Sequence, residues 1–196
     1  LCAKSMNREL AVNQMKYVFT LLSNDIEEIR EYGKENNNGF AQRTLLRTHF
    51  AFIEGMVFQL RCVAIATAKE YPDLFSNQEV TLLQEESYQL NAKGKLETKD
   101  NFQKLLPMLL FTINCYTRIH GAKITVKTGE HGWEALKEYL KIRNRLMHPK
   151  SLEDLELDEA SLKKSTEAAK WFKSTLQEVF DECKKADDYY KNLNCT

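Results

Sequence analysis

The sequence contains few of the residues that interrupt regular secondary structure. Only three prolines and seven glycines occur among 196 residues, and such a composition leaves little material for turns. Hydrophobic residues make up 43% and charged residues 29% of the chain, as in a folded and mostly helical protein. This length suits one hydrophobic core, so we predict a single domain over residues 1–196.

The chain also lacks a net charge, because 28 Lys and Arg residues balance 28 Asp and Glu residues. Nonspecific binding of long nucleic acid by the whole surface is therefore excluded. A local basic segment exists nevertheless, since residues 118–150 hold eight Lys and Arg residues against three Glu residues. The acidic run at residues 153–159 follows directly. Any role with nucleic acid must depend on this basic segment.

Cysteine pairs with the spacing of a zinc or redox site are absent. The five cysteines are widely spread, which predicts reduced thiols in a cytoplasmic protein. Residues 194–196 form a glycosylation sequon, a weak signal at this length. The most apolar stretch, residues 50–66, is interrupted by Glu54 and Arg61, so we expect no membrane span. The chain opens with Leu1 rather than methionine, so we expect residues upstream of it.

Apolar residues recur at helical spacing in five long segments. The pattern predicts helices over residues 11–29, 45–64, 98–116, 133–147 and 158–190. Asp158 should cap the last helix, and Pro107 should kink the third or mark its start. Short connections between long amphipathic helices favour antiparallel neighbours. We therefore predict an all-α fold, an antiparallel up-and-down bundle of four main helices plus short accessory helices.

Shorter elements are predicted between the second and fourth of these helices. Ser76 and Glu79 have the spacing of a capping box and should open a short helix that ends near Tyr88. A polar loop is expected over residues 91–98. Residues 124–128 include β-branched side chains and predict a short extended piece.

The helix predicted over residues 133–147 carries a charged residue among apolar ones. When the sequence is projected at about 100° per residue, Arg143 lies in the middle of the apolar arc. A guanidinium keeps its proton, so this position is costly unless an anion or hydrogen-bond acceptors meet it. We expect one of three partners: a carboxylate such as Glu54, helix-end carbonyls, or a substrate phosphate.

His148 follows this helix and precedes a proline. Pro149 biases His148 away from the α-helical region, so the helix should end near Met147 and His148 should swing towards Arg143. Cleavage of an RNA phosphodiester needs proton transfer, which suits histidine, and stabilisation of phosphorane charge, which suits arginine. This route needs no metal ion, and the sequence has no cofactor motif. One histidine cannot easily be base and acid in the same step, so a symmetric dimer would complete the site.

The same residues also fit a purely structural role. Arg143 would then form an ion pair, His148 and Pro149 would be a stop signal, and cations near the helix end would favour its dipole. Glu54 has two interpretations as well. It is either the partner of Arg143 or one member of an ordinary polar stripe with Arg47 and Arg61.

The remaining histidines have ordinary explanations. His49 lies in an apolar helix and is predicted to be a hydrogen-bonded core residue. His120 and His131 flank the loop before the fourth helix, have no metal-ligand spacing partner, and are predicted to be solvated. No metal site is therefore expected.

The run from Arg143 to His148, Arg-Asn-Arg-Leu-Met-His, resembles the Arg-polar-x(3 to 5)-His signature of the HEPN superfamily. Many of these helical-bundle proteins are metal-independent endoribonucleases of toxin-antitoxin, phage-defence or RNA-processing systems, and others have lost activity and serve as binding modules. The resemblance implies that Arg143 and His148 are catalytic and that Asn144 supports or orients them. It also implies a homodimer with a composite cleft, and an antitoxin or other regulatory protein as partner.

Two functions follow from these patterns. The first is a homodimeric endoribonuclease of toxin or phage-defence type, with RNA bound by Lys141, Arg145 and Lys150 beside the catalytic residues. The second is a catalytically silent bundle that binds a partner protein or a nucleotide. Proximity of His148 to Arg143 in an open cleft favours the first function. Arg143 sealed against Glu54, with His148 in bulk solvent, favours the second.

Overall fold

The computed structural model describes residues 6–193, and the prediction of an all-α fold is confirmed. Cys2, Cys195 and the sequon lie outside the described residues. The helices of the described part are α1 (Arg8–Glu35), α2 (Gly39–Glu70), α3 (Asn77–Leu83), α4 (Leu105–Ile119), α5 (His131–Met147) and α6 (Glu159–Leu193). Two single 3-10 turns, Pro72–Leu74 and Glu153–Leu155, lie in the connections.

The chain divides into two compact units, and the helices α1, α2 and α6 each contribute a part to both. Within the described residues, the first unit consists of residues 6–16, 57–124 and 183–193, and the second of residues 17–56 and 125–182. Each unit is described by itself below. The single domain over residues 1–196 stays a prediction.

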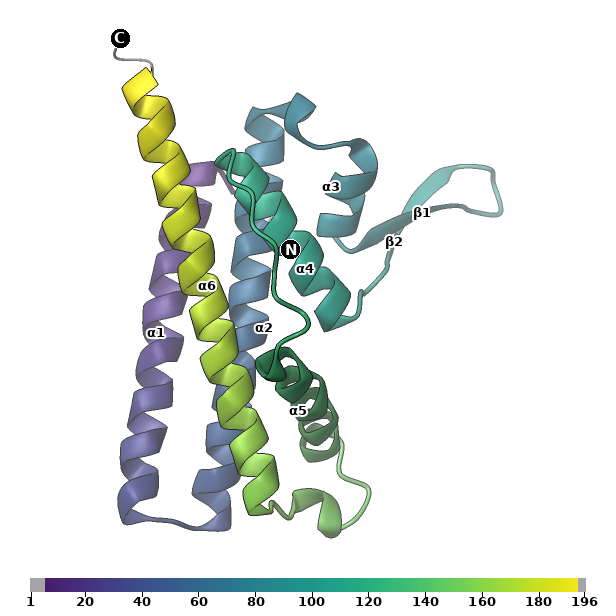
Figure 1. The fold of residues 1–196 in the computed structure, drawn as a ribbon. Helices are drawn as coiled ribbons and strands as arrows, with labels where there is room; N and C mark the ends of the chain where they lie inside the picture. Colours follow the sequence, from purple (N-terminus) through teal and green to yellow (C-terminus); the bar gives the residue numbers. More distant parts are fainter. Residues whose placement is uncertain (1–5, 194–196) are drawn as a thin grey trace. The chain divides into compact units, whose positions relative to one another are not determined.

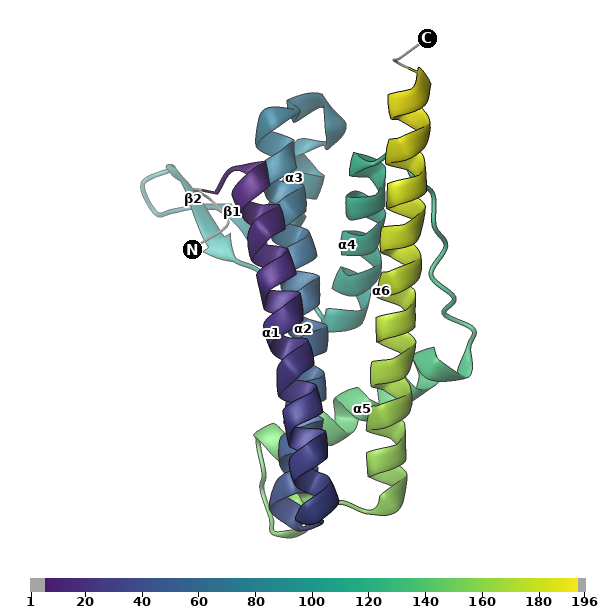
Figure 2. The ribbon, with the colours of Figure 1, turned by 90° about the vertical axis from the view of Figure 1, so that its left-hand side faces the viewer.

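The second unit has an aromatic core to which α1, α2 and α6 contribute. The ring of Phe52 on α2 contacts Phe19 on α1 at 5.6 Å and Phe172 on α6 at 5.9 Å between centroids. The helix α5 crosses α6 steeply rather than running along it, as Figure 2 shows. Asp158 accepts a hydrogen bond from the backbone of Ser161 at 2.7 Å, which confirms it as the cap of α6.

The first unit has a separate core of small and medium apolar side chains. Its buried members come from α2, α4 and the α3 region: Ala64, Ile65, Ala68, Phe75, Leu83 and Cys115. The capping box of α3 is present as predicted, since Ser76 and Glu79 each accept the backbone N–H of the other. Pro107 lies in the first turn of α4 and marks its start, where its missing N–H has no helical partner to lose.

An antiparallel hairpin replaces part of what the sequence predicted as helix and loop. Its strands are β1 (Glu86–Leu90) and β2 (Leu96–Asp100), paired from Glu86 with Asp100 to Leu90 with Leu96. Figure 1 shows the hairpin extending beyond α3. The helix predicted to reach Tyr88 therefore ends at Leu83, and the helix predicted from residue 98 begins only at Leu105. The extended piece predicted at residues 124–128 forms no strand among the described residues.

The helix α2 is the most apolar of the long helices. It is the one helix of the described residues that is long and apolar enough to cross a membrane, and 72% of its apolar window is buried in the fold. Such burial is typical of a core helix. Three of the predicted reduced cysteines, Cys62, Cys115 and Cys183, are buried thiols.

Candidate functional site around Arg143

The position of α5 is fixed at its start by a close contact with α6. Trp133 packs edge-on against Trp171 with ring centroids 5.5 Å apart. A Cβ atom at Gly132 would lie 2.4 Å from the side chain of Trp171, so only glycine allows this approach. Trp171 is itself buried within its own chain. The contact anchors the helix that carries Arg143.

At its other end α5 stops at the residue predicted. The helix ends at Met147, and His148 takes a non-helical conformation with φ −132° and ψ 60°. Its backbone N–H still donates to the carbonyl of Asn144 at 3.1 Å. Pro149 explains the change, since a proline disfavours the helical conformation of the residue before it.

Arg143 faces α2 as its place in the apolar arc predicted, and it meets a carboxylate. Its Nη2 atom donates to both carboxylate oxygens of Glu54 at 3.3 Å, and Nη1 donates to Asn144 Oδ1 at 3.1 Å. The guanidinium carbon lies 4.5 Å from the centroid of the Phe50 ring, within the range of a cation–π contact. The side chain keeps 25% of its surface exposed, and that of Glu54 keeps 46%. Arg143 is thus held from two sides without being sealed.

Phe50 is the part of this cluster that sequence reasoning missed. It lies one turn before Glu54 on α2 and therefore shares a face with it. Its other neighbour is Tyr139, whose ring meets it edge-on at 5.7 Å. The spacing of four residues between Phe50 and Glu54 was the available signal, because both then face the same partner helix.

The interface behind Arg143 is closed. Tyr139 is fully buried and donates its hydroxyl hydrogen to the carbonyl of Leu46. Burial raises the pKa of Tyr139 well above its ordinary value, so the hydroxyl stays protonated. The crevice between these residues, Leu146 and Arg143 is too narrow to hold a water molecule. A ligand of Arg143 would therefore reach only the outer edge of the guanidinium.

His148 lies exposed at the end of α5. Among residues 6–193, no hydrogen bond or ion pair of its side chain is present, so its predicted approach to Arg143 is not seen as a direct bond. The imidazole is available to a substrate or to a second protein surface. In the described part of the chain, Arg143 has a carboxylate partner and His148 has none.

The three predicted RNA-binding cations all lie on the exposed surface around the same helix end. Lys141 pairs with Glu138 at 2.8 Å, and Arg145 donates to the carbonyl of Glu156 at 3.4 Å. Lys150 follows the proline, and its backbone N–H donates to Asp154. The ammonium and guanidinium groups remain accessible to an anion.

Two further arginines, whose contacts with this region were not predicted, reach the backbone that follows Arg143. Arg47 on α2 donates to the carbonyl of Leu146 at 3.4 Å, and Arg43 donates to that of Leu155 at 3.4 Å. Arginine near the last carbonyls of a helix satisfies acceptors that have no helical partner. These contacts tie α2 to both ends of the turn that presents His148.

The other histidines divide into three cases. His49 is buried as predicted, but its Nδ1 atom has no partner and Nε2 lies 3.5 Å from Arg30 Nη2. His131 is largely exposed as predicted and contacts Glu167 at 3.1 Å. The prediction of a solvated His120 was wrong, because its side chain is only 15% exposed and contacts Asp187. Within the described range, no group of three or more His, Cys, Asp or Glu residues is arranged to hold a metal ion.

No protein-family model, curated protein or solved structure matches the chain. The resemblance to the HEPN superfamily therefore still depends on the six residues that suggested it. The function of the Arg143 cluster must be argued from its own chemistry.

Proposed function

We propose that the protein is a metal-independent endoribonuclease of HEPN type, with a toxin or phage-defence role. The observation that carries the proposal is the way Arg143 is held. Phe50 and Glu54 fix its guanidinium at a partly exposed position beside Asn144, five residues before the exposed His148. A fixed cation and a free imidazole on one helix end are the two groups that phosphodiester cleavage requires.

In this mechanism a histidine removes the proton of the ribose 2′-hydroxyl, which attacks the adjacent phosphorus. Arg143 stabilises the charge of the phosphorane, and a second histidine protonates the departing 5′-oxygen. The products are a 2′,3′-cyclic phosphate and a free 5′-hydroxyl. Lys141, Arg145 and Lys150 bind the neighbouring phosphates.

The second histidine comes from a second copy of the chain. Because the interface behind Arg143 is closed, one chain forms only one wall of a cleft. A facing second copy forms the other wall. The dimer then brings two Arg143 and two His148 residues together. An antitoxin or other regulatory protein would keep such a nuclease inactive until it is needed.

Cleavage of varied RNAs in the presence of EDTA tests the proposal. Wild-type protein is expected to cleave, and His148→Ala and Arg143→Ala to lose roughly 100-fold or more of the rate, as for loss of a general acid–base or a charge-stabilising group. His131→Ala is the matched control, because it removes a largely exposed histidine from the opposite end of the same helix. Absence of wild-type cleavage on all RNAs, or equal cleavage by His148→Ala, would sink the proposal.

A catalytically silent bundle is the second candidate, and one observation favours it. Glu54 already occupies Nη2 of Arg143, and no bond joins Arg143 to His148 within residues 6–193. The cluster would then be a structural ion pair in a module that binds a partner protein or a nucleotide. In that case wild-type protein cleaves no RNA, and Arg143→Ala changes only the free energy of unfolding.

A further inference from the structure

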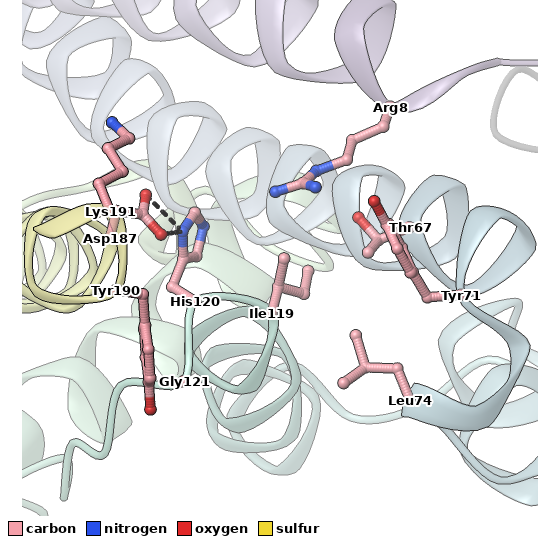
Figure 3. A pocket seen from close by; sticks show the side chains of 10 residues that line it. All are labelled: Arg8, Thr67, Tyr71, Leu74, Ile119, His120, Gly121, Asp187, Tyr190 and Lys191. Carbon is pink, nitrogen blue, oxygen red and sulfur yellow. Dashed lines mark hydrogen bonds and ion pairs between the residues drawn. The ribbon is translucent and has the colours of Figure 1, made fainter. Parts of the chain in front are cut away.

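A pocket in the first unit shares no residue with the Arg143 cluster. It has a volume of about 830 Å³ and is lined by residues of α1, α2, α4 and α6 and of the loops after α2 and α4. Figure 3 shows these side chains around the pocket. The volume falls within the range of roughly 300–1,000 Å³ that is usual for small-molecule sites.

One wall of the pocket holds an oriented histidine. The Nδ1 atom of His120 lies 2.9 and 3.0 Å from the two carboxylate oxygens of Asp187. An ionised carboxylate only accepts hydrogen bonds, so Nδ1 carries the proton and donates it. The ring of Tyr116 also packs on the imidazole at a tilt, with centroids 5.2 Å apart. The carboxylate therefore fixes the imidazole in one orientation.

Arg8 enters the pocket from α1. Its backbone N–H donates to Glu70, a residue that does not line the pocket. Within the described part of the chain, its guanidinium has no hydrogen bond or ion pair. In Figure 3 the guanidinium extends into the space between His120 and Tyr71. A half-buried guanidinium without a partner is a strong site for a phosphate, which it can bind with two parallel hydrogen bonds.

The remaining walls are apolar and aromatic. Leu74, Ile119 and the ring of Tyr71 face the pocket, and Lys191 lies at its rim, where its ammonium pairs with Asp188 at 4.0 Å. Gly121 allows Tyr190 to close the side next to His120, because a Cβ atom there would lie 2.8 Å from the Tyr190 ring. Gly121 also has φ +67°, a conformation that favours glycine. The pocket thus offers cationic groups on one side and ring-sized apolar surface on the other.

We propose that this pocket binds a small organic phosphate monoester whose phosphate meets Arg8 and His120 and whose ring packs on Tyr71, Leu74 and Ile119. The phosphate supplies the partner that the Arg8 guanidinium lacks. The ring fills the apolar side, which a bare phosphate ion would leave in water. The proposal does not depend on nuclease activity.

The probe is phenyl phosphate, with two matched controls. Inorganic phosphate lacks the ring, and phenol lacks the phosphate. Their dissociation constants are measured by chemical-shift titration of the ¹⁵N-labelled full chain. Phenyl phosphate is expected to bind most tightly. Arg8→Ala should weaken its binding about tenfold or more, as for the loss of a charged hydrogen bond. Tyr71→Ala removes an exposed ring, which leaves folding intact, and should weaken phenyl phosphate but not inorganic phosphate.

Two control variants separate this site from other cations. Lys99→Ala removes one positive charge from the exposed strand β2 and should bind phenyl phosphate as wild type does. Arg143→Ala should also retain binding. The proposal is overturned if phenyl phosphate binds no tighter than phenol, or no tighter than inorganic phosphate. It is equally overturned if Arg8→Ala and Tyr71→Ala both bind like wild type, or if Arg143→Ala alone abolishes binding.

Discussion

His49 is a buried histidine in a helix that is otherwise mostly apolar on its inner face. Burial, and to a lesser extent the nearby Arg30, lowers the pKa of His49 from 6.5 to about 4. The unfolded chain therefore takes up a proton below pH 6.5 that the folded chain accepts only near pH 4. The stability that comes from the neutral imidazole is complete above pH 6.5 and is lost as the pH falls towards 4.

We predict that the free energy of unfolding decreases by up to about 3 kcal/mol over that window through His49 alone. His49→Gln has no titrating group at this position and should show a correspondingly flatter pH dependence. Urea unfolding of both proteins at pH 7 and at pH 4.5 measures the difference, with pH 7 as the reference. Identical pH dependence of the two proteins would contradict the assigned role of His49.

The partner of Arg143 illustrates what a residue pattern can and cannot reveal. Projection of α5 placed Arg143 in an apolar arc, and that alone required an acceptor, of which Glu54 was one of the named options. The stacking of Arg143 on Phe50 was not predictable in the same way. It depends on which turn of α2 lies opposite α5, and helical periodicity gives the face of a helix but not its alignment with a neighbour.

At the scale of elements, the short helix α3 depends on its capping box. Ser76 accepts the backbone N–H of Glu79 at 3.2 Å, and Glu79 in turn pairs with Arg118 at 2.8 Å. The hydrogen bonds from Arg118 and Ser76 lower the pKa of Glu79, so this support is present above the ordinary pKa of a glutamate and is lost in acid. Only seven residues form the helix, so it has few other contacts to define its start.

Ser76→Ala is therefore expected to reduce the free energy of unfolding by about 1 kcal/mol, the usual effect of losing an N-cap. Ser174→Ala makes the same chemical change on an exposed position inside α6, where alanine is the better helix former, and should be neutral or slightly stabilising. Urea unfolding at pH 7 measures both. Equal effects of the two substitutions would mean that the cap does not stabilise the protein.

The hairpin shows why an element between two predicted helices was missed. Alternation in Ser87-Tyr88-Gln89-Leu90 is too short to outweigh the helical pattern before it, and Tyr88, Leu90 and Leu96 are exposed in the described structure. The connection between the two strands was the stronger indication of a hairpin. Asn91 accepts the backbone N–H groups of Lys93 and Lys95, and Gly94 has φ +70°, both of which are features of a tight turn between paired strands.

At the scale of the whole molecule, the proposed nuclease requires two chains. We predict a particle with twice the 22.8 kDa mass of one chain, measured by light scattering after size exclusion. The cleavage rate per chain should fall on dilution below the dimer dissociation constant, because each isolated chain presents one His148 and a one-sided surface. A monomer that cleaves equally well per chain at every concentration would contradict the composite site.

The contacts of α5 with Phe50 determine the position of Arg143 along the axis of that helix. Tyr139 and Arg143, one helical turn apart, contact the same ring from two directions. A slip of α5 by one residue would shift Arg143 about 1.5 Å along the helix axis and rotate it by about 100°. Both contacts would then be broken together. The Phe50 ring therefore opposes any movement of α5 along its axis. The distance from Arg143 to the end of α5 then does not depend on the loop that follows.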